Sequence, residues 1–234
     1  MNNTVPASNA VQKPGVTTIL LADDHPLLRK ALRDILEKES DFEIVGEAGD
    51  GEQAVSLARQ LLPDMVIMDI SMPNLDGLEA TRQIKASNPS IMVLALTVHT
   101  DDESVLEILQ AGAAGYLVKN LVTDEVVRSI RAVLAGEMVL SPSIGKLLLK
   151  YAARYPTRPL PLGTGEKLST RELEVLKLTA RGMSNKDIAQ ALGINLRTVK
   201  GHQADIFSKL GVASRTEAVI TGLRAGILSL DDLQ

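Results

Sequence analysis

The sequence predicts two domains, an α/β domain with a doubly wound, five-stranded parallel sheet and an all-α domain of four helices with a helix-turn-helix. Two observations support this. Between residues 16 and 137, five short apolar runs alternate with segments whose apolar residues recur at helical spacing. From residue 166 to 228 there is no strand-like run. Alternating strands and helices favour a parallel sheet covered on both faces, and we expect the strand order 2-1-3-4-5.

The strands and helices of the first domain are bounded by Gly, Pro and Asp. The apolar runs are too short for helices, which favours strands. We expect these strands at Thr18–Ala22, Glu43–Ala48, Met65–Asp69, Ile91–Thr97 and Gly115–Val118. Apolar residues between them recur about every 3.6 residues, which predicts helices at 26–38, 51–61, 77–87, 101–112 and 122–135.

The second domain carries strong helix-end signals. Helices are expected at 169–181, 185–192, 196–210 and 214–225. Ser169 and Glu172 have the spacing of a capping box. N-cap residues precede the other three helices, and glycines suited to C-caps follow all four: Ser184, Asn195 and Ser214, then Gly182, Gly193, Gly211 and Gly226.

The remaining segments are polar or rich in proline. The first fifteen residues lack an apolar core, so we expect a disordered tail and no signal peptide. The connector has a candidate helix at 144–153 and then Pro156, Pro159 and Pro161, which favour an extended chain. The expected division is tail 1–15, α/β domain 16–137, linker 138–165, helical domain 166–228 and C-terminal tail 229–234.

Composition excludes several classes of protein. The 234 residues include no Cys, so disulfides, thiolate metal sites and cysteine catalysis are excluded, and a reducing cytoplasmic location is expected. No run of about 18 apolar residues occurs, so no membrane span is expected. From Glu166 onward there are ten basic and eight acidic residues, against fifteen and twenty-one before it. The basic second part suggests nucleic acid as a partner.

Acidic residues stand where two expected strands end. Asp23 and Asp24 follow the first strand, and Asp69 ends the third. Thr97 ends the fourth strand, and Lys119 follows the fifth. Because ligands of doubly wound sheets bind at the carboxyl ends of the strands, these five side chains should share one crevice.

Crowded carboxylates need a hard cation, and oxygen ligands suit Mg²⁺. We expect Asp24, Asp69 and the Ser71 backbone carbonyl to bind the ion directly, and Asp23 through water. Lys119 could then stabilise a phosphoryl group delivered to Asp69, and Thr97 could hydrogen-bond it. The simpler alternative for Asp23 and Asp24 is that they cap the following helix.

The first domain resembles a two-component receiver. The resemblance spans residues 16–137 and depends on the segments Leu21–His25, Asp69–Pro73, Leu96–Thr97 and Gly112–Lys119. It implies a flavodoxin-like strand order, phosphorylation of Asp69 by a sensor histidine kinase, and a switch formed by Thr97 and Tyr116. Tyr116 could instead be a packing residue. Two further hypotheses concern histidines: His99 influences the lifetime of the phosphate, and the scattered His25, His99 and His202 form no transition-metal site.

The segment from residue 185 to 210 has helix-turn-helix proportions. Val199, Ile206 and Leu210 form the core face of its second helix. A basic, small-residue face lies opposite and suits a DNA major groove, although a solvated helix face is the simpler reading. The predicted DNA-binding residues are Lys186, Arg197, Thr198, Lys200, Gly201, Gln203, Ala204, Lys209 and Arg215.

The second domain strongly resembles the LuxR/NarL-type DNA-binding domain. The matching segments are Leu168–Leu176, Gly182–Ala189, Thr198–His202 and Lys209–Val212. The resemblance implies that the last helix pairs with its copy in a homodimer bound to two DNA half-sites. Gly201 and Ala204 are short where relatives often carry longer side chains, so we expect substantial indirect readout.

The function expected is a phosphorylation-activated, DNA-binding transcription regulator of the NarL/FixJ response-regulator family. It would need Mg²⁺ and catalyse only its own phosphorylation and slow dephosphorylation. One alternative is a Mg²⁺-dependent phosphatase with an aspartyl nucleophile. Ser71 stands where such enzymes usually place a general acid. Another alternative is a regulator that does not respond to phosphorylation.

Overall fold

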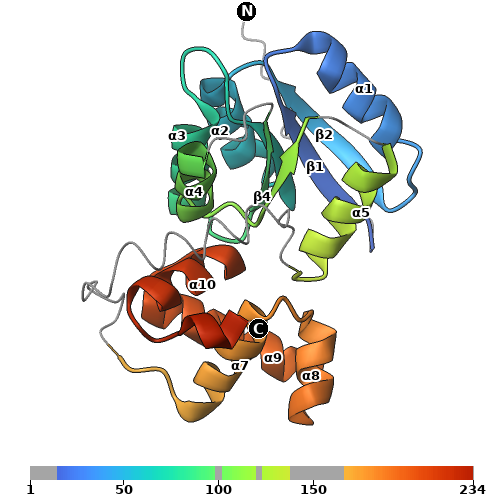
Figure 1. The fold of residues 1–234 in the computed structure, drawn as a ribbon. Helices are drawn as coiled ribbons and strands as arrows, with labels where there is room; N and C mark the ends of the chain where they lie inside the picture. The colour runs from blue at the N-terminus through green and yellow to red at the C-terminus, as the bar shows by residue number, and fades with distance from the viewer. Residues whose placement is uncertain (1–14, 98–101, 120–122, 138–165, 234) are drawn as a thin grey trace, which may run out of the picture.

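The computed structural model describes residues 15–97, 102–119, 123–137 and 166–233. The first domain has a five-stranded parallel sheet in the order β2-β1-β3-β4-β5, as the sequence predicted (Figure 1). The strands are β1 Thr17–Ala22, β2 Phe42–Ala48, β3 Met65–Asp69, β4 Met92–Thr97 and β5 Gly115–Val118. The helices are α1 Pro26–Leu36, α2 Gly51–Leu61, α3 Gly77–Ser87, α4 Asp102–Gln110 and α5 Thr123–Leu134.

Helices cover both faces of this sheet. Helices α1 and α5 pack on one face, and α2, α3 and α4 pack on the other. All five residues of β3 are buried, which explains why its sequence is an uninterrupted apolar run up to Asp69. The register pairs Ala22 of β1 with Met68 of β3. Asp23 and Asp69 therefore leave the sheet side by side.

The second domain contains only helices and their connecting segments among its described residues. Its helices are α7 Thr170–Ala180, α8 Asn185–Leu192, α9 Leu196–Leu210 and α10 Arg215–Arg224. The predicted capping box at Ser169 and the three predicted N-caps are present. Ser184 forms a second capping box with Asp187, which the sequence analysis missed. A short 3-10 helix, Leu230–Leu233, occupies part of the expected C-terminal tail.

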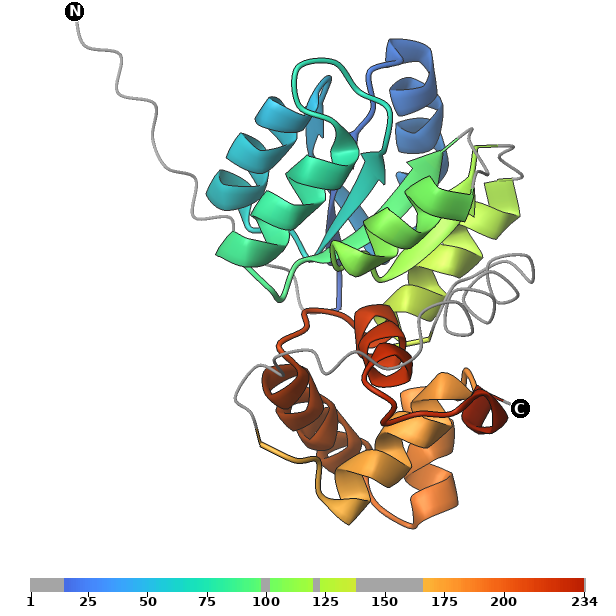
Figure 2. The same ribbon diagram turned by 60° about the vertical axis from the view of Figure 1, so that its left-hand side comes forward.

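The two domains contact each other through α10. This helix lies between them and packs against α4 (Figure 2). The Ser214 hydroxyl donates to the Ala113 carbonyl at 3.3 Å, and the Thr216 hydroxyl donates to the Ala114 carbonyl at 3.2 Å. Ile220 is buried within an apolar cluster of the first domain. The helical domain is thus docked on the α4–β5 side of the sheet.

Some expectations fall outside the part of the chain that the structure describes. These are the N-terminal tail, His99 and the linker with its candidate helix. None of the helices in the described ranges has both the length and the apolar character needed to cross a membrane.

Candidate functional site

The acidic crevice forms at the carboxyl edge of the sheet. Asp23 and Asp69 are each 1% exposed. The Lys119 ammonium, just after β5, lies 2.6 Å from Asp69 Oδ2 and 2.8 Å from Asp23 Oδ2. Asp24 is more open, with a side chain 31% exposed. Strand order and register thus bring together the side chains of Asp23, Asp24, Asp69 and Lys119, as expected from where each strand ends. The fifth predicted side chain, that of Thr97, lies outside what the structure describes.

The loop after Asp69 is held tightly in place. The Ser71 amide donates to Asp69 Oδ1 at 3.2 Å, and the Gly77 amide donates to the Ile70 carbonyl at 2.9 Å. A Cβ added at Gly77 would lie 1.9 Å from the Asp69 carbonyl oxygen. Only glycine permits this approach, which fixes the backbone on both sides of Ser71.

A second contact ties the same loop to α2. Asn74 has a left-handed backbone, with φ of 64°. Its side-chain amide donates to Asp50 Oδ2 at 3.3 Å, and the Gly51 amide donates to the Leu75 carbonyl at 3.1 Å. Asp50 also caps α2 by accepting from the Gln53 amide. The loop that carries the predicted Ser71 ligand is therefore anchored at both ends.

The electrostatics of the crevice favour a bound cation. Burial raises the pKa of Asp69, and the nearby Lys119 opposes that rise only in part. Burial lowers the pKa of Lys119, but its bonds to Asp23 and Asp69 outweigh this, so the net change is a rise. Apart from ion pairs with Lys119 and His25, the buried oxygens Asp23 Oδ2, Asp24 Oδ1 and Asp69 Oδ2 have no hydrogen-bond partner. Three carboxylates facing one ammonium fit a hard divalent cation such as Mg²⁺.

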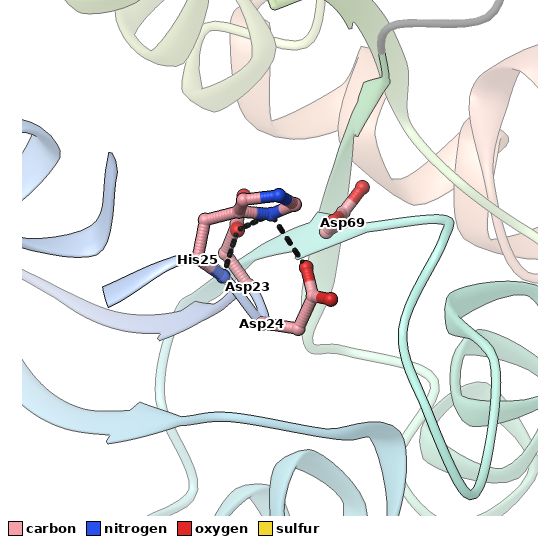
Figure 3. Close-up of side chains that lie close together, drawn as sticks. All are labelled: Asp23, Asp24, His25 and Asp69. Carbon is pink, nitrogen blue, oxygen red and sulfur yellow. Dashed lines mark hydrogen bonds and ion pairs between the residues drawn. The ribbon is translucent and has the colours of Figure 1, made fainter. Parts of the chain in front are cut away.

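Two other predicted residues of this domain, Thr97 and Tyr116, lie on the neighbouring strands β4 and β5. Thr97 ends β4 beside Val118 of β5, so its backbone is at the same edge. Tyr116 is 2% exposed and packs in the apolar cluster under α4. The sequence analysis missed His25, whose Nδ1 lies 2.6 Å from Asp24 Oδ1 (Figure 3). Its position directly after the acidic pair was the signal that pointed to it.

The helix-turn-helix is present as predicted, and α9 is its second helix. Val199, Ile206 and Leu210 are buried in the helical core. Most of the predicted DNA-binding residues on and near this helix are exposed: Lys186, Arg197, Lys200, Gly201 and Ala204. Thr198 is half-buried, and its amide and hydroxyl donate to the N-cap Asn195.

Three predicted DNA-binding residues are committed to protein contacts in this structure. Gln203 is buried and donates to Asn185 Oδ1 at 2.7 Å. Lys209 pairs with Glu172 at 2.9 Å. Arg215 is 7% exposed and donates to backbone carbonyls, including that of Gly136 in the first domain. In the docked state the Arg215 guanidinium is enclosed by protein, so its contact with a DNA phosphate stays a prediction.

A cavity of about 350 Å³ lies between the domains. The α9 residues Lys200, Gln203 and Ala204 line one side. Residues from the end of α5 line the other side, among them Val133 and Leu134. Part of the predicted DNA-binding face of α9 therefore borders this cavity and faces the first domain.

Comparison with known proteins agrees with both domains. Residues 19–131 match the response regulator receiver domain, and residues 166–221 match the bacterial regulatory proteins of the luxR family. The transcriptional regulatory protein LiaR of Bacillus subtilis is 41% identical over 204 residues, covering 86% of this chain and 94% of LiaR.

Solved structures of RcsB are similar to this chain over both domains. RcsB of Salmonella typhimurium is 27% identical, with a TM-score of 0.54, over 85% of this chain and 93% of that one. A structure of two RcsB dimers bound to two parallel DNAs is 25% identical, with a TM-score of 0.53, over 87% and 96%. The chain belongs to the response regulators that join a receiver domain to a LuxR-type DNA-binding domain.

Proposed function

We propose that this response regulator is switched by a phosphoryl group on Asp69, and that phosphorylation promotes its dimerisation and promoter binding. The observation that carries the proposal is the placement of Asp69. Its buried carboxylate faces Lys119 at 2.6 Å beside Asp23 and Asp24. The receiver and LuxR-type domains together support a phosphorylation-regulated transcription regulator, and this site is the matching acceptor.

The chemistry proposed is transfer from a phosphohistidine of a sensor kinase. A carboxylate oxygen of Asp69 attacks phosphorus, the phosphorus–nitrogen bond breaks, and an aspartyl phosphate forms. Lys119 stabilises the charge on the phosphoryl oxygens, and Thr97 donates a hydrogen bond to one of them. Asp24, Asp69 and the Ser71 carbonyl would hold Mg²⁺ directly and Asp23 through water. When bound, Mg²⁺ neutralises charge that develops during transfer.

The docked arrangement is proposed to be the low-affinity state for DNA. The α9 residues Lys200 and Ala204 line the cavity against the receiver, and Arg215 is buried there. Phosphorylation would shift the population toward separated domains. Freed α10 helices would then pair in a homodimer, which places two α9 helices on two half-sites of double-stranded DNA. The similar RcsB binds DNA as dimers, which supports a dimeric DNA-bound form of this chain.

No further enzymatic activity is proposed beyond slow loss of the chain's own phosphate. A phosphatase with an aspartyl nucleophile would need an acid near Asp69, and Ser71 occupies that position of the loop. The similar LiaR is a transcriptional regulator. A cytoplasmic location is proposed on the same ground, since sensor-kinase output and promoter DNA meet there.

The test measures the molecular mass of the protein in solution, which reports dimerisation, and its affinity for DNA. Light scattering and binding to a panel of duplex DNA would be measured with and without Mg²⁺ plus acetyl phosphate, for the wild type and Asp69→Ala. We expect a larger dimer fraction and tighter DNA binding only for phosphorylated wild type. Equal DNA binding in all samples would mean that Asp69 does not gate the helical domain.

A further inference from the structure

His25 lies within the acidic cluster, although reasoning from the sequence assigned it no role there. Its Nδ1 is 2.6 Å from Asp24 Oδ1 and 3.4 Å from Asp23 Oδ1. One candidate ligand atom from each of Asp23, Asp24, His25 and Asp69 lies within 4.8 Å of all the others. Figure 3 shows the imidazole next to the Asp23 and Asp24 carboxylates that it contacts. One ion could thus bind the His25 nitrogen together with the carboxylate oxygens.

The backbone places His25 directly beside the acidic pair. His25 precedes α1 with extended angles, φ −93° and ψ 104°, because the following Pro26 disfavours a helical conformation at this position. Its amide donates to Asp23 Oδ1 at 2.8 Å. The side chain is 70% exposed. The ring contacts Asp24 from an exposed position, so solvent or an ion can reach it.

The cluster also needs a ligand with positive charge. Asp23 and Asp69 are almost fully buried, and Lys119 is the one ammonium or guanidinium group within ion-pair distance of them among the described residues. Asp23 Oδ2, Asp24 Oδ1 and Asp69 Oδ2 have no hydrogen-bond partner beyond their ion pairs. Two buried carboxylates share the single Lys119 ammonium, so a second cation would offset their remaining negative charge.

We propose that the neutral His25 imidazole is a nitrogen ligand of the cation site, which therefore prefers Mn²⁺ and Co²⁺ to Mg²⁺. This inference rests on the cation site of the proposed function and adds a ligand to it. Carboxylate and carbonyl oxygens suit Mg²⁺, whereas imidazole favours transition metals in the order Mn²⁺ below Co²⁺. In the metal-free protein a proton must lie between His25 Nδ1 and Asp24 Oδ1, which are 2.6 Å apart. Binding of the ion would release that proton, and His25 would bind through Nδ1 with its remaining proton on Nε2.

The experiment uses the untagged full chain without phosphodonor. Isothermal titration measures Mg²⁺, Mn²⁺ and Co²⁺ affinity, and visible absorption with pulsed electron paramagnetic resonance reports nitrogen bound to Co²⁺ or Mn²⁺. The chain has three histidines, so the single variants His25→Asn, His99→Asn and His202→Asn test every imidazole. Asp24→Asn serves as the variant expected to weaken all three ions.

We expect His25→Asn to lower Co²⁺ affinity at least about tenfold and to remove the nitrogen signal, with Mg²⁺ affinity unchanged. Unchanged Mg²⁺ binding also shows that the variant is folded. The inference is overturned if His25→Asn alters Co²⁺ and Mg²⁺ equally, alters neither, or if His99→Asn removes the nitrogen signal.

Two results separate this inference from the proposed function. If the wild type binds Co²⁺ through His25 but does not bind Mg²⁺, the nitrogen ligand stands and Mg²⁺-dependent phosphorylation is wrong. If Mg²⁺ binds and selectivity is independent of His25, the nitrogen ligand is wrong and the proposed function stands. If no ion binds, both are wrong.

Discussion

Ile220 of α10 and Tyr116 of β5 are buried in one apolar cluster, although they belong to different domains. Strand β5 connects this cluster to the acidic site. Lys119 follows the strand and pairs with Asp69, while the Ala113 and Ala114 carbonyls before it accept hydrogen bonds from the start of α10. A displacement of β5 or Lys119 on phosphorylation therefore has a direct mechanical route to the docked helix.

Ile220→Ser should weaken domain docking. Ile220 is 2% exposed, and burying such a side chain stabilises by about 1.5–3 kcal/mol. Docking should thus weaken by about tenfold or more. Hydrogen exchange of α4 and α10 should quicken in unphosphorylated protein, and its DNA binding should tighten. Leu27→Ser is the control, because Leu27 is 85% exposed on α1. Unchanged exchange in Ile220→Ser would contradict a docked α10 in solution.

Arg215→Met should destabilise the helical domain. The Arg215 guanidinium donates to the Thr179 carbonyl at 3.1 Å, to the Met183 carbonyl and to Asn185 Oδ1 at 3.4 Å. Burial lowers its pKa to about 10, so it stays charged at neutral pH. Loss of these bonds should reduce the free energy of unfolding by about 2–4 kcal/mol, measured by urea denaturation.

The same variant separates two roles for Arg215. If Arg215 contacts a DNA phosphate, its replacement should lower DNA affinity and leave the stability of the protein unchanged. If Arg215 is structural, its replacement should lower the stability of the helical domain. Arg197→Met is the matched control, because Arg197 is exposed at the start of α9. We expect that control to keep its stability and to lose DNA affinity with a reduced salt dependence.

The Arg215 result illustrates what the sequence could and could not predict. Strands, helices and caps follow from local periodicity and end signals, so nearly all of their bounds were correct within a few residues. The edge site followed from strand order, because Asp23, Asp69 and Lys119 each end or follow a strand. The contact of Arg215 with Gly136 joins the two domains and depends on docking between segments about 80 residues apart. No local pattern encodes that contact.

His25 shows a second limit of sequence reasoning. Histidine spacing excludes a site built from several histidines, and that reasoning ignored one histidine joined to carboxylates. Its ring contacts Asp24 where the chain is extended before Pro26, at the start of α1. The local motif was visible, but its geometry required the fold.

Lys85 should make stability depend on pH. It is 6% exposed, donates to the Pro89 carbonyl at 2.5 Å and the Ile91 carbonyl at 2.9 Å, and faces Glu217 of α10. Burial lowers its pKa from 10.5 to about 8. Between these values the unfolded chain binds more protons than the folded protein, so this group's contribution to stability rises with pH.

Lys85→Met removes that titration and leaves the other groups in place. From pH 7.5 to pH 9.5, the free energy of unfolding of wild type minus that of Lys85→Met should rise by about 2 kcal/mol. Urea denaturation at the two pH values measures it. Lys200→Met is the control, because Lys200 is exposed. A difference that stays constant would show that Lys85 is not desolvated in solution.

Gly201→Ala should stabilise the helical domain. Gly201 lies inside α9, and a Cβ added there would meet nothing within 4 Å. Alanine is favoured over glycine within a helix by about 1 kcal/mol, so thermal unfolding should shift upward by a few degrees. The free protein therefore gives no steric reason for glycine at this position.

Close approach of α9 to DNA is the reason that we predict for this glycine. If α9 enters the major groove with Gly201 against the bases, the added methyl should weaken binding to specific DNA while the protein becomes more stable. Fluorescence anisotropy measures the DNA affinity, and thermal unfolding measures the stability. Ala191→Gly, at an exposed position of α8, is the control. Raised stability with unchanged affinity would place Gly201 away from the DNA and would remove the argument that small residues on α9 permit close approach and indirect readout.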